Sequence, residues 1–200
     1  MKDYLRLLDT ARKEEIFAYE TLKDFLFNKK ITYIGDDIEN GLPDIFTDDF
    51  LIGVEVVTCE RRVIHKYTEK NRLPIKFSMK IKSDKIVNRG GQKIRQSEQD
   101  EYYQNLRINI AKKLKLLKQG NYSGTKNIFL CILSVYEKKP YIDLNVVAKI
   151  YFEETKKLNI KFDMLLFIVN KTLYGINEKN EFAIIEEYNY SKIKVDKIFK

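Results

Sequence analysis

Apolar side chains recur at alternating spacings of three and four residues over the first part of the chain, and this pattern predicts a helix from Asp3 to Asn28. One step of the spacing falls on Glu15, where leucine would be expected. A carboxylate on the buried stripe of a helix needs a partner charge, a metal ion or a functional reason. The apolar positions of the stripe are Tyr4, Leu8, Ala11, Ala18, Leu22 and Phe25.

Three short apolar runs follow, and their length is typical of β-strands. They are Ile31–Ile34, Leu42–Thr47 and Phe50–Cys59. The second and third runs are separated by Asp48-Asp49, which predicts a two-residue hairpin with Asp44 opposite Gly53. Because side chains alternate along a strand, Asp44 and Glu55 then share one face as diagonal neighbours, and Gly53 leaves open space beside them.

The second half of the chain alternates between helical and strand patterns. The expected elements are a helix over Asp100–Gln119, a buried strand over Asn127–Tyr136, a helix capped by Asp143 that runs to Leu158, a buried strand over Phe162–Asn170 and a hairpin over Leu173–Tyr188. This order predicts an α/β fold in which helices flank a mixed central sheet. A length of 200 residues fits a single domain over residues 1–200.

Positive charge is concentrated in one part of the chain. From Arg61 to Lys118 there are 17 Lys and Arg but 5 Asp and Glu, so this stretch alone exceeds the net charge of +8 of the whole chain. A basic block on an otherwise acidic chain favours a polyanionic partner, and a solvated lysine-rich surface is the alternative. We expect a basic, partly irregular insertion over residues 61–98, with an exposed strand at Ile75–Ile81. The expected nucleic-acid contacts are Arg61, Arg62, Arg89, Lys93 and Arg95.

Several classes of protein are disfavoured by the sequence. The first residues lack the apolar segment of a signal peptide, and no apolar run approaches the ~20 residues of a membrane-spanning helix. We therefore expect a cytoplasmic protein that does not bind a membrane. Two distant cysteines and a single histidine disfavour a zinc site.

Asp44 and Glu55 carry the candidate chemistry. Two carboxylates that lie close together repel each other unless a cation or a proton relieves the repulsion, and oxygen ligands of this kind suit Mg²⁺. A helix, then Pro43-Asp44 on one strand and Glu55 on the next, then a helix and a strand, resembles the PD-(D/E)XK nuclease superfamily over about residues 3–136. The resemblance implies a restriction-endonuclease-like αβββαβ core. It also implies that Asp44, Glu55 and the Val56 carbonyl hold Mg²⁺, with Mn²⁺ as a substitute, and that Glu15 joins the site.

The sequence departs from the pattern of that family at one position. The lysine that would follow the glutamate by two residues is Val57. Some members of the superfamily carry this lysine on the following helix, and the resemblance then assigns the catalytic role to Lys113. Lys113 borders the apolar stripe of Ile110 and Leu114, whereas Lys112 points farther away.

These observations favour a metal-dependent nuclease that acts on DNA rather than RNA, with a homodimer as an open alternative. Val57 leaves a second hypothesis open, in which a catalytically degenerate nuclease fold binds nucleic acid or a protein, as an accessory factor or antagonist in a mobile-element or defence system. In a third hypothesis the basic block binds an acidic protein. A purely structural interpretation also remains, in which Asp44 starts a strand after Pro43 and Glu55 pairs with a lysine.

Overall fold

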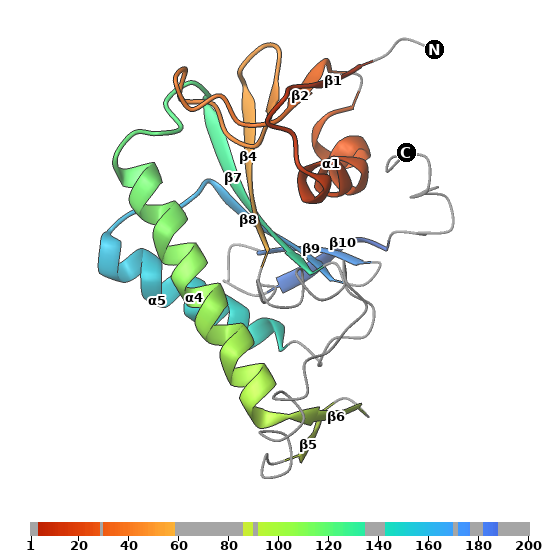
Figure 1. Ribbon diagram of the computed structural model, residues 1–200, viewed down its shortest axis with the longest axis vertical. Coiled ribbons are helices and arrows are strands. Elements are labelled where there is room, and N and C mark those ends of the chain that lie inside the picture. The colour runs from red at the N-terminus through yellow and green to blue at the C-terminus, as the bar shows by residue number, and fades with distance from the viewer. Residues whose placement is uncertain are drawn as a thin grey trace.

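The computed structural model describes residues 4–28, 30–58, 86–89, 92–134, 143–169, 172–176 and 182–187. These residues form an α/β fold in which helices lie on both faces of a mixed sheet (Figure 1). The helices are α1 (Lys13–Leu26), α4 (Gln96–Lys118) and α5 (Leu144–Leu158). The strands are β1 (Leu5–Leu7), β2 (Thr32–Ile34), β3 (Ile45–Thr47), β4 (Ile52–Thr58), β5 (Ile86–Arg89), β6 (Gln92–Arg95), β7 (Asn127–Ser134), β8 (Met164–Val169), β9 (Thr172–Ile176) and β10 (Phe182–Glu187).

The described residues form an eight-stranded sheet in the order β1-β2-β3-β4-β7-β8-β9-β10. Strands β4, β7 and β8 are parallel to one another at the centre, and β2–β3–β4 and β8–β9–β10 are antiparallel. Strand β1 joins the edge parallel to β2. A separate antiparallel hairpin, β5–β6, leads directly into α4. The prediction of a mixed sheet flanked by helices is thus confirmed.

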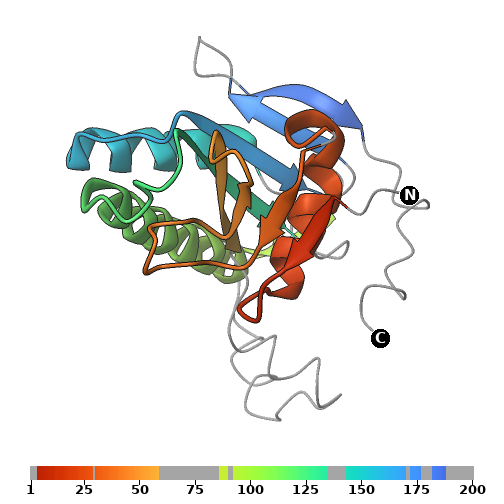
Figure 2. The same cartoon turned by 90° about the horizontal axis from the view of Figure 1, so that it is seen from above.

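Helix α1 covers one face of the sheet, and α4 and α5 cover the other (Figures 1 and 2). The alternation of β4 follows this layering, because Val54 and Val56 pack in the core beneath α1 and Val57 packs in the core beneath α4. Arg107 on α4 joins the two outer helices through ion pairs of 2.6 Å to Glu153 and Glu154 on α5. Position 55 therefore faces α4.

The prediction of a helix beginning at Asp3 is wrong. Residues Leu5–Leu7 form a strand, and α1 begins only at Lys13. The edge of the sheet explains the difference, because the Thr32 amide donates to the Tyr4 carbonyl at 2.7 Å and the Leu8 amide donates to the Ile34 carbonyl at 2.9 Å. These long-range backbone bonds override a helical pattern that is only local.

The predicted register of the β3–β4 hairpin is also wrong, by two residues. Ile45 pairs with Val54 and Phe46 pairs with Gly53, so the connecting loop comprises residues 48–51 rather than two residues. The Thr47 hydroxyl accepts from the Ile52 amide at 3.2 Å, and this bond sets the wider turn. An even shift leaves every side chain on its expected face.

This register changes the surroundings of Gly53. If the pairing of Ile45 with Val54 is extended by one residue, Asp44 lies directly opposite Glu55 instead of opposite Gly53. The predicted open space at Gly53 does not exist, since a Cβ there would lie 2.6 Å from Pro43 Cγ and 2.7 Å from Thr125 Oγ1. Gly53 serves close packing and leaves no gap for an ion.

The remaining elements agree with their predictions to within a few residues, and Asp143 caps α5 by accepting from the Asn145 amide at 2.9 Å. Most of the predicted basic insertion, including Arg61, Arg62 and Ile75–Ile81, lies outside the described residues. Within the described part of the chain, no helix is long and apolar enough to span a membrane.

Candidate functional site

The structure brings four predicted site residues together where α1, β3, β4 and α4 meet. Glu15, Asp44 and Glu55 are 1%, 2% and 3% exposed, and the side chain of Lys113 is 19% exposed. These residues come from segments separated by up to about a hundred positions. We call this group, together with Arg12, the carboxylate cluster.

Lys113 forms an ion pair with Glu55 across the layer between α4 and β4. The neighbouring helix positions Ile110 and Leu114 are fully buried, so the lysine stem crosses over the sheet, and Lys112 is exposed as predicted. Burial lowers the pKa of Lys113, while the nearby Asp44 carboxylate acts in the opposite direction. Lys113 therefore interacts with both carboxylates of the hairpin.

Asp44 makes two hydrogen bonds with its side chain. One carboxylate oxygen accepts from the Val56 amide at 2.8 Å, and the other accepts from the Arg12 guanidinium at 2.8 Å. The first bond follows from the short β3 strand, which begins at Ile45 and leaves the Val56 amide without a strand partner on that side. The preceding Pro43 has no amide hydrogen to extend the ladder. Asp44 thus has a structural role at the end of β3 whatever else it does.

Glu15 lies in the first turn of α1 and shares Arg12 with Asp44. The Arg12 amide donates to Glu15 at 2.9 Å, and the Arg12 guanidinium forms an ion pair with the same carboxylate. Burial, followed by the charge of Asp44, raises the pKa of Glu15 to about 7, and Arg12 acts in the opposite direction. Glu15 is therefore a buried group able to exchange a proton near neutral pH.

Sequence reasoning missed Arg12. Its side chain is 56% exposed, yet its guanidinium links two buried carboxylates. The wrong helix boundary hid this role, because a helix begun at Asp3 makes Arg12 an ordinary surface position. Acidic residues favour the first turn of a helix, so the pair Glu14-Glu15 is the signal that could have placed the helix start just after Arg12.

Sequence reasoning also missed Tyr122, in the turn after α4. Its ring is buried, and its hydroxyl has no hydrogen-bond partner among the described residues. Burial, with smaller contributions from Asp44 and Asp36, raises the pKa of Tyr122. Most buried hydroxyls in proteins are hydrogen-bonded, so the Tyr122 hydroxyl is an exception. Nothing in the local sequence pattern indicates that Tyr122 is buried.

The oxygen donors of Asp44 and Glu55 fit a divalent cation in chemical type. Both carboxylates are held by a basic side chain, and the exposed Arg12 is the one that can move aside most easily. In the part of the chain that the structure describes, no group of three or more His, Cys, Asp and Glu side chains is arranged to hold a metal ion. A metal bound here would depend on backbone carbonyl and water ligands in addition to the two carboxylates.

Three of the predicted nucleic-acid contacts fall on described residues, and their backbone lies away from the carboxylate cluster, whereas Arg61 and Arg62 lie outside the described residues. Arg89, Lys93 and Arg95 belong to the β5–β6 hairpin at the amino-terminal end of α4 (Figure 1). Lys113 lies seventeen residues beyond the first residue of α4, which corresponds to about 25 Å along the helix axis. The hairpin and the cluster are therefore placed at different points along one long helix.

No protein-family model matches the chain, and no curated protein or solved structure shows significant similarity to it.

Proposed function

We propose that this protein is a metal-dependent nuclease that hydrolyses phosphodiester bonds of nucleic acid, with DNA as the expected substrate. The observation that carries the proposal is the ion pair between Lys113 on α4 and Glu55 on β4, beside Asp44. The order α1-β2-β3-β4-α4-β7 supports a restriction-endonuclease-like αβββαβ core. A lysine on the helix that follows the glutamate strand supports the proposed replacement for Val57.

Asp44, Glu55 and the Val56 carbonyl would hold the metal ion. A bound Mg²⁺ supplies polarisation of the scissile phosphate and a lowered pKa for a water ligand. Lys113 orients the attacking water or offsets the charge that develops on the phosphate in the transition state. Its lowered pKa suits this role, because burial makes the ammonium a better hydrogen-bond donor than a solvated lysine.

Glu15 and Arg12 add a second pair of groups to the cluster. Glu15, with a pKa of about 7, is suited to accept the proton that the attacking water loses. Arg12 bridges Glu15 and Asp44, and because its side chain is 56% exposed, its guanidinium can turn toward a phosphate oxygen when the substrate enters. The basic block over residues 61–118 would hold the phosphate backbone outside the cluster.

A second candidate function is a nuclease-like protein that binds nucleic acid or a protein without cleaving. The ion pairs of the β3–β4 hairpin favour this second function. Asp44 is paired with Arg12, and Glu55 is paired with Lys113, so each carboxylate already has a basic partner. When Glu15 is protonated, the two remaining carboxylates and the two basic side chains balance in charge, so the cluster does not require a metal ion. In this case the cluster has the structural role of joining α1 and α4 to the sheet.

Cleavage assays separate the two candidates. Wild-type protein is incubated with single-stranded and duplex DNA and with RNA, in Mg²⁺, in Mn²⁺ and in EDTA. Under the proposal, cleavage requires the metal, and Lys113→Ala lowers its rate by about a hundredfold or more while metal and nucleic-acid binding persist. Lys112→Ala is the matched control on the exposed face of α4 and should cleave normally. Binding without cleavage of any substrate would instead support the second candidate.

A further inference from the structure

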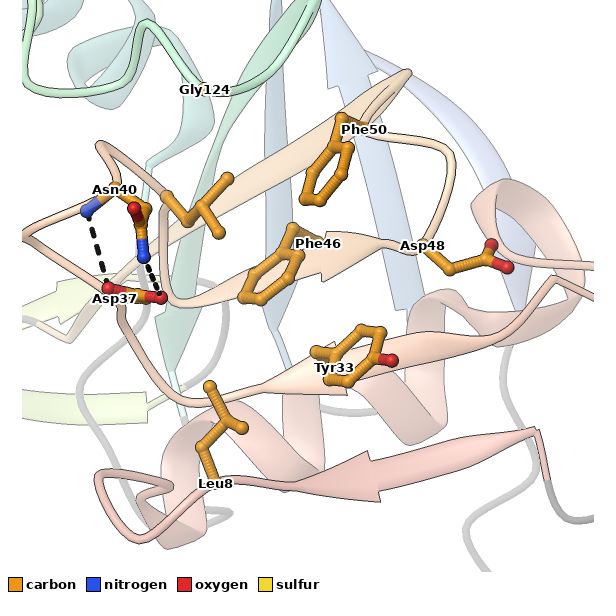
Figure 3. A pocket seen from close by; sticks show the side chains of 9 residues that line it. Leu8, Tyr33, Asp37, Asn40, Phe46, Asp48, Phe50 and Gly124 are labelled. Carbon is orange, nitrogen blue, oxygen red and sulfur yellow. Dashed lines mark hydrogen bonds between the residues drawn. The ribbon is translucent and has the colours of Figure 1, made fainter.

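An open pocket of about 460 Å³ lies over β2, β3 and the loop of residues 48–51 (Figure 3). Its lining includes the aromatic side chains Tyr33, Phe46 and Phe50 and the polar side chains Asp37, Asn40 and Asp48. The proposed catalytic groups do not line it.

The three aromatic rings form a ladder. The Tyr33 and Phe46 centroids are 5.1 Å apart with planes 8° from parallel, and the Phe46 and Phe50 centroids are 6.2 Å apart with planes 14° from parallel. Strand pairing accounts for the first step, because Tyr33 lies directly opposite Phe46. Phe50 is 48% exposed and is the least covered of the three rings. A flat ligand could therefore extend the ladder at Phe50.

The backbone holds Phe50 in an uncommon conformation. Its φ is +54°, a left-handed value that is unfavourable for a bulky side chain. Two hydrogen bonds fix this conformation, from the Phe50 amide to the Thr47 carbonyl and from the Lys126 amide to the Phe50 carbonyl, each at 2.9 Å. Backbone strain of this kind clusters at sites of function. The fold thus keeps a half-exposed ring stacked on Phe46 at an energetic cost.

One residue of the pocket lining, Phe46, is close in sequence to Asp44 of the carboxylate cluster. Phe46 follows Asp44 by two residues, so the two positions share a face and lie about 7 Å apart along the strand. Successive nucleotides of an extended strand are separated by a similar length. A phosphate at Asp44 and Glu55 would therefore bring a neighbouring base over the aromatic ladder.

The charge of the pocket excludes a phosphate from it. No Lys or Arg is among the described residues that line the pocket, whereas Asp37 and Asp48 are. Asn40 fixes the carboxylate of Asp37. The backbone amide of Asn40 donates to one carboxylate oxygen at 3.3 Å, and its side-chain amide donates to the other at 2.8 Å. A rim of carboxylate and amide groups is complementary to the exocyclic amino groups of adenine, cytosine and guanine. Apolar ring faces with an acceptor-rich rim fit a base and not a backbone.

We propose that this pocket binds an unpaired base of the nucleic-acid strand whose phosphate lies at the carboxylate cluster, with the base stacked on Phe50. The inference rests on the proposed nuclease function and adds a requirement for single-stranded or locally unpaired substrate. Stacking on an aromatic ring is a sequence-tolerant source of binding energy for single strands.

Phe50 can be tested with little risk to the fold because its ring is half exposed. The chain contains no tryptophan, so Phe50→Trp makes the only indole a reporter of stacking. To keep the strand uncleaved with the metal ion present, Phe50→Trp is combined with Lys113→Ala. We expect a single-stranded DNA of about 12 nucleotides to quench this fluorescence in Mg²⁺, and an otherwise identical strand with abasic positions to quench it much less.

Affinity measurements provide the second readout. We expect Phe50→Ala and Phe50→Leu each to weaken binding of the normal strand about tenfold, and to have no effect on binding of the abasic strand. Leu51→Ala is the matched control, since Leu51 is similarly exposed but does not line the pocket. Circular dichroism verifies that all variants are folded.

The outcomes distinguish this inference from the proposed function. If wild-type protein cleaves but Phe50→Ala binds like wild type and Phe50→Trp is not quenched, the base pocket is wrong and the nuclease stands. If base-dependent quenching occurs without metal-dependent cleavage, the pocket stands and the nuclease is wrong. Quenching by an arginine-rich peptide but not by DNA would overturn the inference and assign the pocket to a basic protein segment.

Discussion

Two buried carboxylates, those of Glu15 and Asp44, share the single guanidinium of Arg12. Burial and the charge of Asp44 raise the pKa of Glu15 to about 7 from an ordinary value of 4.5. Between these two values the folded protein holds a proton on Glu15 that the unfolded chain has released. The free energy of unfolding must therefore fall as the pH rises through this range.

We predict that Glu15→Gln removes this dependence of stability on pH. In EDTA, the free energy of unfolding of the wild type should fall by roughly 2 kcal/mol between about pH 5 and pH 8, since one pKa unit corresponds to about 1.4 kcal/mol. Urea titrations across this range measure it. The control Glu14→Gln, one position earlier on α1, should keep the wild-type slope. An unchanged slope in Glu15→Gln would show that another group carries the dependence.

Tyr122 presents the opposite case, a buried polar group with no described hydrogen-bond partner. Removing a hydroxyl that is desolvated and unpaired costs nothing in lost hydrogen bonds. We therefore predict that Tyr122→Phe leaves the free energy of unfolding unchanged or raises it by up to about 1 kcal/mol. Tyr151→Phe is the matched control and should be destabilising, because the Tyr151 hydroxyl accepts from the Phe162 amide at 3.0 Å. A clear loss of stability in Tyr122→Phe would point to an ordered water at its hydroxyl.

At the scale of elements, the long periodic segments were predictable and the short ones were not. Helices α4 and α5 and strands β7 and β8 agree with their apolar patterns, because each pattern matches the face that the element buries. Strand β1 could not be predicted, since its three residues are ordered by the edge of β2 and not by their own periodicity. The β3–β4 register depends on the hydrogen bond from the Ile52 amide to the Thr47 hydroxyl, and this bond cannot be predicted from the usual lengths of hairpin turns.

The faces of the hairpin were nonetheless predicted correctly, and this allowed part of the cluster to be found. An error of two residues preserves the alternation, so Asp44, Glu55 and Lys113 converge as expected from strand and helix geometry. Arg12 was missed because its position depends on where α1 begins. Tyr122 was missed because turns carry no periodicity from which the direction of a side chain can be inferred.

The ion pair between β4 and α4 yields a prediction about packing. Removing one partner leaves the other charge buried, so Lys113→Met and Glu55→Gln should each lower the free energy of unfolding by roughly 2–4 kcal/mol. The double variant should lose much less than the two single losses added together. Chemical denaturation of the four proteins in EDTA measures this coupling. Lys112→Met serves as the control and should be within about 0.5 kcal/mol of wild type. Additive losses would mean that the two side chains do not interact.

The β5–β6 hairpin yields a prediction about binding. Charge reversal at Arg89, Lys93 and Arg95 should weaken DNA binding and reduce the slope of log K against log salt by about one for each lost phosphate contact. Fluorescence anisotropy at several salt concentrations measures both effects. Equivalent reversals at Lys149, Lys156 and Lys161, which are exposed and outside the basic block, provide a charge-matched control. Equal effects in both triple variants would mean that only net charge matters.

At the scale of the whole molecule, the carboxylate cluster joins all three layers. Arg12 is the N-cap of α1, which carries Glu15 on one face of the sheet, and Lys113 belongs to α4 on the other face. Between them, Asp44 directly precedes β3 and Glu55 lies on β4. A ligand that binds the cluster therefore contacts groups from every layer. Binding to the folded state alone must then raise the stability of the entire fold.

We predict that Mg²⁺ raises the melting temperature of the wild type. At a concentration about a hundredfold above Kd, a ligand adds about 2.7 kcal/mol to the free energy of unfolding. For a chain of this size, that gain corresponds to an increase in Tm of roughly 5–10 °C relative to EDTA. Differential scanning calorimetry measures the increase, which Asp44→Asn and Glu55→Gln should abolish. Asp143→Asn, which preserves the cap of α5 outside the cluster, should keep it.

Arg12→Ala provides the sharpest form of this prediction because its two effects have opposite signs. In EDTA the variant should melt below the wild type, since Glu15 and Asp44 lose their shared cation and repel each other. In Mg²⁺ its gain in Tm should exceed that of the wild type, because a metal ion no longer competes with the guanidinium for Asp44. If Mg²⁺ changes the Tm of neither protein, the cluster is a set of ion pairs that hold the layers together, and the metal-dependent mechanism is wrong.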